Sequence, residues 1–297
     1  MILKDRPDGK ALKVPNFKKL NPYMFPTRDE SVLFAEERFD IDNAIAMLLE
    51  INKGKDPEDR INLFHIILAA YMRTVVERPI LNTFVAGQRY FRRNELSFSF
   101  VVKKDISDEG EETILKIIFN PEDTLHDVAR RVKDAVNHSK SAIGNTTEKE
   151  IDIVMALPRF GIKAFMWFYR FLDYHNLLPG FMIKTDPLYA TAFFTNLGSI
   201  GMDSISHHLY NWGTCSVFIS VGKVKKGPIF DNRHGNMKIG HVLDMKMTLD
   251  DRVADGVYYY NSLTTFKKYV EHPEPLLEPA GYTKEHIAEL DLKYVPE

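Results

Sequence analysis

The stretches that decide the fold are Phe194-Thr-Asn-Leu-Gly-Ser-Ile-Gly-Met-Asp203 and Asp250-Asp-Arg-Val-Ala-Asp-Gly256. The first begins inside an apolar run, residues 192–196, that has the composition of a strand. The second comes directly after an alternating strand pattern at 237–249 and directly before a helical pattern at 255–270. Each motif therefore lies where a strand ends, and its polar side chains make it a candidate site.

The composition of the whole chain is that of an ordinary globular protein. It has 297 residues, of which 44% are hydrophobic and 27% charged, and a formal net charge of -2. Disordered and collagen-like classes are excluded, and the charge gives no electrostatic footprint for nucleic acid or anionic lipid. The single Cys215 rules out an intrachain disulfide and fits a reducing compartment. We find no signal peptide and no apolar run of about 20 residues, so we expect a cytoplasmic protein without a membrane span.

Periodicity predicts a mixture of strands and helices. Period-two patterns predict strands at 96–102, 113–119, 192–196, 214–224 and 237–249, and 3.6-residue patterns predict helices at 42–54, 57–76, 124–138 and 255–270. The third of these helices starts with a capping box, Thr124 to Asp127. Because the strands form hairpins instead of alternating regularly with helices, an α/β sandwich on a mixed sheet is favoured over a doubly wound fold.

Two segments stand apart from this pattern. Residues 1–38 are broken by prolines and are predicted to form an extended arm, with one domain at 39–297. Residues 160–172 are dense in Phe, Met, Trp and Tyr, which favours a buried or interface helix. The alternative is a lid or membrane-touching helix, for which Lys163 and Arg170 provide too few charges.

Together the two motifs resemble the catalytic domain of dihydrolipoyl acyltransferases from 2-oxoacid dehydrogenase complexes, and its relative chloramphenicol acetyltransferase. That family carries Ser/Thr-Asn-Leu-Gly followed by Gly and Asp, and a C-terminal His-Arg-Val-x-Asp-Gly. The resemblance runs from about residue 21 to 279 and leaves out one extra segment at about 144–187. It implies a chloramphenicol acetyltransferase-like two-layer sandwich with a mixed β-sheet and flanking helices.

The chain departs from the family at one position. Where the family has the His that takes a proton from the acyl acceptor, this sequence has Asp251. Imidazole suits proton abstraction near neutral pH, whereas a carboxylate is a weaker base unless burial or a neighbouring charge such as Asp250 raises its pKa. His207 and His208 are either two half-buried structural histidines or the replacement for the missing base.

The resemblance also implies roles for the remaining motif residues. Thr195 would donate its hydroxyl to the oxyanion of the tetrahedral intermediate. Asp255 would support the active-site turn by pairing with an arginine, for which Arg28 is a candidate, or it is a plain helix N-cap. Gly256 would permit the tight turn into the helix.

Ligand-binding residues are less well marked. Lys223, Lys225 and Lys226 are weak candidates for binding coenzyme A. Cys215 is predicted to be a core thiol, although a thioester-forming role stays open. We expect no metal site, because His207 and His208 lack a third ligand and only His234 or His241 is arguable.

Two functions remain. The first is a stand-alone acyltransferase that binds a coenzyme A or lipoyl thioester as co-substrate and transfers the acyl group to a small acceptor. It carries no covalently bound cofactor, and the resemblance implies a homotrimer with active sites between subunits. The second is a catalytically inactive homologue that acts as a ligand-binding or interaction protein. Neither involves nucleic acid.

Overall fold

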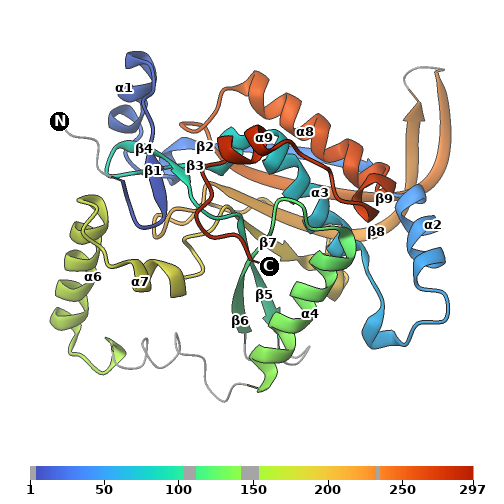
Figure 1. Cartoon of the computed structure of the whole chain (residues 1–297), viewed down its shortest axis with the longest axis horizontal. Helices are drawn as coiled ribbons and strands as arrows, with labels where there is room; N and C mark the ends of the chain where they lie inside the picture. Colours follow the sequence, from blue (N-terminus) through green and yellow to red (C-terminus); the bar gives the residue numbers. More distant parts are fainter. Residues whose placement is uncertain (1–4, 104–111, 142–153, 232–234, 297) are drawn as a thin grey trace.

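A six-stranded mixed sheet organises the computed structural model, which describes residues 5–103, 112–141, 154–231 and 235–296 (Figure 1). Its strands, in spatial order, are β2 (Val32–Asp40), β9 (Asn236–Asp250), β8 (Val217–Asp231), β7 (Ala192–Asn196), β5 (Ser97–Lys103) and β6 (Glu112–Ile118). β7 pairs in parallel with β5 and β8, and the other neighbours are antiparallel. The predicted α/β architecture on a mixed sheet is confirmed.

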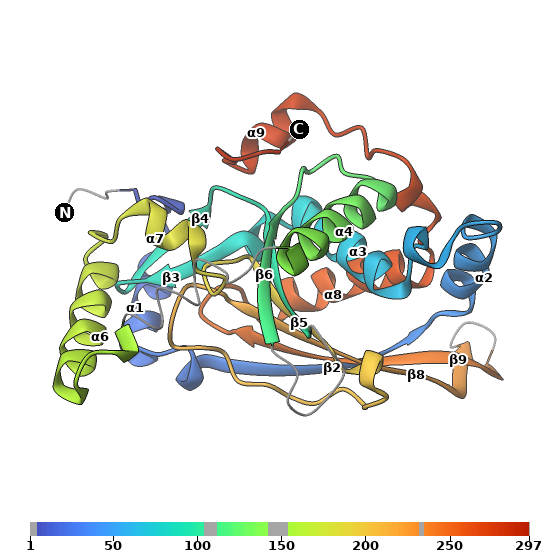
Figure 2. The same ribbon diagram turned by 90° about the horizontal axis from the view of Figure 1, so that it is seen from below.

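Helices cover one face of this sheet, which gives the molecule two layers (Figure 2). They are α2 (Asp42–Ile51), α3 (Leu63–Glu77), α4 (Leu125–Ser141) and α8 (Gly256–Glu271), and α3 packs against both α4 and α8. The core lies between the layers. Tyr71 of α3 packs edge-on against Phe194 of β7 and Phe266 of α8, with ring centroids 5.5 Å apart in each pair.

The opposite face of the sheet, called the outer face below, carries Thr195. Because strand side chains alternate between faces, Phe194 enters the core while Thr195 lies on the outer face. The strand register places Thr195 level with Ser220 of β8, and Ser220 level with Lys246 of β9. The segment 202–212 runs over this face, where the backbone N–H of Ile205 donates to Ser220 Oγ at 3.2 Å.

The predicted element positions agree closely with the structure for most of the chain. Strand β7 has the predicted bounds, and β5, β6, β9, α2, α4 and α8 lie within three residues of prediction at each end. The helix predicted at 57–76 forms as α3, but its predicted start at Pro57 is wrong. Pro57–Asp59 forms only a 3₁₀ turn, and α3 begins at Leu63, where Asn62 and His65 cap each other.

The N-terminal segment is more structured than a free arm. It contains β1 (Gly9–Ala11), the short α1 (Asn16–Met24) and most of β2, which forms the edge of the large sheet. β1 also joins a second sheet, in the order β1-β4-β3, with β3 (Thr83–Ala86) and β4 (Arg89–Arg93). The segment therefore contributes to both sheets.

The aromatic segment forms α6 (Arg159–Tyr174), which lies with α7 (Gly180–Thr185) at one end of the molecule (Figures 1 and 2). Of the expected buried or interface helix, the buried alternative is wrong, because Tyr169 is the only buried residue of α6, and the interface alternative stays a prediction. The side chains of the opposite face are exposed. A last short helix, α9 (Lys284–Glu289), follows α8, and none of the described helices is long and apolar enough to cross a bilayer.

Candidate functional site

Thr195 lies at the carboxyl end of β7, half-buried and beside an open cleft of about 840 Å³. The cleft is bounded by the ends of β5 and β7, the start of α3 and the side of α4, and its walls include Phe64, Phe100 and Asn137. A hydroxyl at the mouth of such a cleft can donate to a bound carbonyl oxygen. Thr195 borders this cleft and its side chain lies on the outer face, so its oxyanion role stays a prediction.

A close backbone contact holds the turn after Thr195. A Cβ on Gly198 would lie 2.4 Å from the backbone oxygen of Gly222, so only glycine allows the 3₁₀ turn Leu197–Ile200 to approach β8 this closely. Ser199 Oγ donates to Asn196 O at 2.6 Å and closes the turn. The Asn-Leu-Gly part of the motif therefore fixes the backbone beside Thr195.

The second motif is held by a buried ion pair. Arg252 donates to both carboxylate oxygens of Asp250, at 2.8 and 2.7 Å, and Ser31 Oγ donates to one of them at 3.1 Å. Asp251, between the paired residues, is exposed, and its backbone N–H donates to Ser31 O at 2.8 Å. The motif thus gives a rigid turn that presents Asp251 outward.

The expected pairing of Asp255 with Arg28 is wrong. Asp255 Oδ1 accepts from Tyr258 N–H at 2.8 Å, so Asp255 is the N-cap of α8. Arg28 is buried and donates to Val85 O at 3.0 Å, because its side chain extends toward the small sheet. Both residues act structurally in the described contacts.

Lys18 reaches the second motif from the N-terminal segment. Its Nζ donates to Val253 O at 2.5 Å, inside the second motif. Burial lowers the pKa of Lys18, and the nearby carboxylate of Asp255 opposes this shift. Sequence reasoning missed Lys18, since one lysine in a proline-rich segment gives no periodic or motif signal for a contact more than 200 residues away.

His207 is the better placed of the two adjacent histidines. Its ring stacks on Phe218 of β8 with centroids 4.0 Å apart, and Thr248 Oγ1 donates to its backbone oxygen. Nδ1 of His207 lies 2.7 Å from His208 O, and a carbonyl only accepts, so Nδ1 carries the proton. In the neutral ring, Nε2 is then free to accept a proton.

His208 is more exposed, with Nδ1 3.6 Å from the carboxylate of Asp29 and 3.1 Å from the backbone oxygen of Leu209. His241 is bound to Asp42, with Nδ1 2.9 Å from the carboxylate. His234 lies outside the described residues. Within the described part of the chain no three His, Cys, Asp or Glu side chains are placed to hold a metal ion.

The strand register separates the predicted site residues into two groups. Thr195 is level with Lys246, and Asp251 follows Lys246 by five residues, which places it roughly 16 Å further along the sheet. Phe218, on which the His207 ring stacks, lies on the neighbouring strand β8, two residues before Ser220, the residue paired with Thr195. The Cα atoms of Phe218 and Thr195 are therefore roughly 8 Å apart. The outer face therefore brings Thr195 and His207 into one region and leaves Asp251 outside it.

The lysine cluster is partly neutralised. Lys225 Nζ lies 3.1 Å from Asp203 and 3.0 Å from Asp244, so its charge is already paired. Lys223 and Lys226 are exposed. Of the three predicted lysines, Lys223 and Lys226 therefore remain candidates for binding a phosphate.

Cys215 lies just before β8 in a buried apolar cluster with Phe193, Leu209 and Phe218. Its Sγ is 3.2 Å from the backbone oxygen of Val217. Burial raises the pKa of the thiol, which disfavours the reactive thiolate. The geometry supports the core-thiol interpretation of Cys215.

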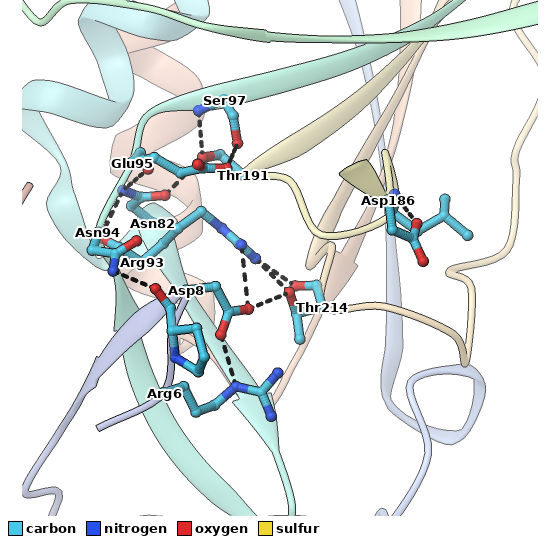
Figure 3. Close-up of polar contacts among 12 residues, drawn as sticks. Arg6, Asp8, Asn82, Arg93, Asn94, Glu95, Ser97, Asp186, Thr191 and Thr214 are labelled. Atoms are coloured by element: carbon cyan, nitrogen blue, oxygen red, sulfur yellow. Dashed lines mark hydrogen bonds and ion pairs between the residues drawn. The ribbon is translucent and has the colours of Figure 1, made fainter. Parts of the chain in front are cut away.

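Figure 3 shows a buried polar network that sequence reasoning missed. Asp8 accepts from Arg6 at 2.8 Å and lies 3.8 Å from Arg93, which donates to Thr214 Oγ1 at 2.8 Å. Asn82, Glu95, Ser97 and Thr191 extend it by further hydrogen bonds. The network ties the N-terminal segment to β4 and to the loop before β8, which is a structural role.

Comparison with known proteins finds one matching protein family. Residues 187–278 match the model of the family 2-oxoacid dehydrogenases acyltransferase (catalytic domain), a range that contains both motifs. No curated protein matches the sequence at a significant level.

Solved structures extend this likeness to most of the chain. A dihydrolipoamide acetyltransferase of Azotobacter vinelandii is 14% identical, with a TM-score of 0.58 over 91% of this chain and 95% of that one. The cubic core of a pyruvate dehydrogenase multienzyme complex is 15% identical, with a TM-score of 0.56 and the same coverage. A chloramphenicol acetyltransferase is 14% identical, with a TM-score of 0.50 over 91% of this chain and 100% of that one. The predicted chloramphenicol acetyltransferase-like fold is confirmed.

Proposed function

We propose that this protein is an acyltransferase that moves an acyl group from a thioester to a small thiol, hydroxyl or amine acceptor. The observation that carries the proposal is the placement of Thr195 at the end of β7, beside the cleft and next to the turn that Gly198 holds. The match of residues 187–278 to an acyltransferase catalytic-domain family supports it. Coenzyme A is the donor class we favour, with Lys223 and Lys226 as the side chains available to its phosphates.

The reaction needs one proton acceptor and one hydrogen-bond donor. The acceptor group loses its proton to a base and attacks the thioester carbonyl carbon, which places negative charge on the carbonyl oxygen. The Thr195 hydroxyl donates to that oxygen, and collapse of the intermediate breaks the C–S bond and releases the donor thiol, which takes up the proton. Removing one such donor typically costs about 10²–10³ in kcat.

His207 is the base we favour. No described residue is hydrogen-bonded to its Nε2, its ring stacks on Phe218, and the Cα of Phe218 lies roughly 8 Å from that of Thr195. His207 and Thr195 lie on the same outer face, where a substrate between them would need base, attacking atom and carbonyl oxygen at successive separations of about 3 Å. Asp251 is exposed, and within the described chain its hydrogen bond is made by its backbone.

A site shared between copies is the competing arrangement for Asp251. One solved structure with this fold is the cubic core of a multienzyme complex, and for this chain we propose a homotrimer. In such an assembly Asp251 of one copy can approach Thr195 of the next, although the two lie far apart in one chain. This arrangement and the one with His207 make opposite predictions for variants.

The test is thiol release from acetyl-CoA and longer acyl-CoAs with a panel of thiol, hydroxyl and amine acceptors. We expect Thr195→Ala to lose about 10² or more and His207→Gln to lose about 10², while Asp251→Ala stays within twofold. A loss of tenfold or more in Asp251→Ala with His207→Gln unaffected would assign the base to Asp251. Equal activity of wild type and Thr195→Ala would overturn the proposal.

An inactive homologue is the second candidate, because Asp251 stands where the resembled family has its His. If wild type releases no thiol from any donor while Asp251→His gains turnover, the fold is intact and the native chain is a binding protein. Titration calorimetry with coenzyme A then measures the retained binding. A sizing experiment that gives a monomer would count against the shared site.

A further inference from the structure

The exposed face of α6 carries a row of aromatic side chains. Phe160, Trp167, Phe171 and Tyr174 are spaced i, i+7, i+11 and i+14 and so lie on one side of the helix. They are 77%, 66%, 42% and 44% exposed, and Figure 1 shows α6 along the margin of the molecule. Phe181 of α7, 69% exposed, adds to this surface, called the aromatic face below.

One edge of the aromatic face is basic. Arg159, Lys163 and Arg170 are spaced i, i+4 and i+11, which aligns them beside the aromatic row, and all three are exposed. Lys184 of α7 is exposed as well, so this surface carries four positive charges and not only those of Lys163 and Arg170, on which the sequence argument against a membrane contact depended. Within residues 154–185, the one acidic side chain, Asp173, turns away and binds Arg6 at 2.7 Å, so the exposed charges of this surface are all positive.

The other side of α6 already has its contacts. Tyr169 stacks on Trp212 with centroids 4.3 Å apart, and Trp212 Nε1 donates to Asp186 at 2.6 Å. Tyr169, Leu178, Ile183 and Tyr189 form a separate small core beneath the helix. The opposite side of α6 is therefore already packed against the protein, and the aromatic face is not needed for packing within this small core.

We propose that the aromatic face binds the surface of an anionic lipid membrane. Trp, Tyr and Phe suit the boundary between headgroups and acyl chains, and a helix with an apolar face and Lys/Arg at its edge lies in that boundary. The basic edge complements anionic headgroups, each nearby charge adding to the attraction. The overall net charge of -2 gives no general attraction, so binding depends on this one surface.

The experiment uses the whole 297-residue chain with vesicles of pure phosphatidylcholine and vesicles containing one third phosphatidylglycerol. We expect cosedimentation with the anionic vesicles at low salt, at least tenfold more than with phosphatidylcholine, and reduced binding at 0.5 M salt. The chain has two Trp, and Trp167 is the exposed one, so a blue shift of its emission reports insertion.

Variants at exposed positions separate the contribution of the aromatic side chains from that of the basic side chains without disturbing the core. Trp167→Ala/Phe171→Ala and Lys163→Glu/Arg170→Glu should each reduce binding to anionic vesicles at least tenfold. The matched control is Phe230→Ala/Ile239→Ala on the β8–β9 hairpin, which removes two side chains exposed by 68% and 66%. This control should bind within twofold of wild type.

Three results would overturn the proposal. The first is no cosedimentation of wild type with anionic vesicles at low salt. The second is equal loss of binding in the hairpin control. The third is concentration-dependent self-association that Trp167→Ala abolishes, which would assign the aromatic face to a second copy of the chain.

Discussion

Asp250 and Arg252 form a buried ion pair on either side of Asp251, with two hydrogen bonds at 2.8 and 2.7 Å and side chains at most 3% exposed. Arg252 also donates to Phe25 O at 2.9 Å, and Asp250 O accepts from Tyr259 at 2.8 Å. The turn is therefore held by residues flanking position 251. A substitution of Asp251 therefore changes the exposed functional group of the turn but keeps the Asp250–Arg252 ion pair that holds its backbone.

Asp250→Asn should destabilise the protein by about 3 kcal/mol or more, because it leaves the buried guanidinium of Arg252 without its counter-charge. Chemical denaturation monitored by circular dichroism measures the free energy of unfolding. Arg38→Ala is the matched control: Arg38 holds Asp244 with two hydrogen bonds of similar length, at 2.7 and 3.1 Å, but on the surface. That control should cost less than about 1 kcal/mol. Equal losses would contradict the prediction.

Gly198→Ala should cost about 1–3 kcal/mol and reduce acyl transfer, because the new Cβ meets the backbone oxygen of Gly222 and displaces the turn that positions Thr195. Gly256→Ala is the control. A Cβ there meets no atom within 4 Å and the backbone has no positive φ, so the turn expected to need Gly256 does not need it within this chain. Thermal unfolding and thiol release measure both effects. A neutral Gly198→Ala would show that the contact relaxes freely.

His65 gives the protein an acid-sensitive helix start. Burial lowers the pKa of His65 to about 4, and its Nδ1 accepts from Asn62 N–H at 3.2 Å only while the ring is neutral. The folded pKa is below the ordinary value of about 6.5, so this stability is present above pH 6.5 and is lost as the pH falls toward 4. The loss is at most roughly 3 kcal/mol.

Denaturation at pH 7, 5.5 and 4.5 tests this, with His65→Gln as the comparison, since Gln can replace His in the capping box without titrating. We expect the fall in stability between pH 7 and 4.5 to be smaller in the variant. A parallel fall in both proteins would place the acid sensitivity at other residues.

The local parts of the fold follow from the sequence. The capping box Thr124–Asp127 is formed as predicted, with Thr124 N–H donating to Asp127 at 3.1 Å and Asp127 N–H donating to Thr124 Oγ1 at 3.3 Å. Such features depend on residues a few positions apart. The start of α3 was misplaced because Asn62 is capped reciprocally by a His, and the usual partner at that position is Glu or Gln.

Contacts between distant segments could not be predicted in the same way. The nearness of His207 to Thr195 depends on the segment 202–212 turning back along β8, which no periodicity encodes. The exposure of α6 was missed because the helix is apolar on both sides, so its pattern does not say which side packs. Motif spacing found Thr195, whereas Lys18 and Arg6 carried no local signal.

Arg6 and Asp173 link the N-terminal segment to α6 and give the last prediction. Arg6 is 2% exposed and donates to Asp173 Oδ1 at 2.7 Å. It also donates to Asp8 at 2.8 Å, the contact drawn in Figure 3. Asp173→Asn removes one carboxylate from this contact while Asp8 still neutralises Arg6. We therefore expect local loosening of α6 instead of global unfolding.

Hydrogen exchange measured by mass spectrometry distinguishes local loosening of α6 from global unfolding. In Asp173→Asn, exchange in residues 159–176 should rise at least tenfold, while the core helix α3 keeps its protection. Asp291→Asn is the control, because Asp291 makes an ion pair with Lys10 at 2.6 Å on the surface, and exchange across α6 should not change. Uniformly faster exchange in α3 and α6 would mean that the ion pair supports the whole domain and that α6 does not open as a separate unit.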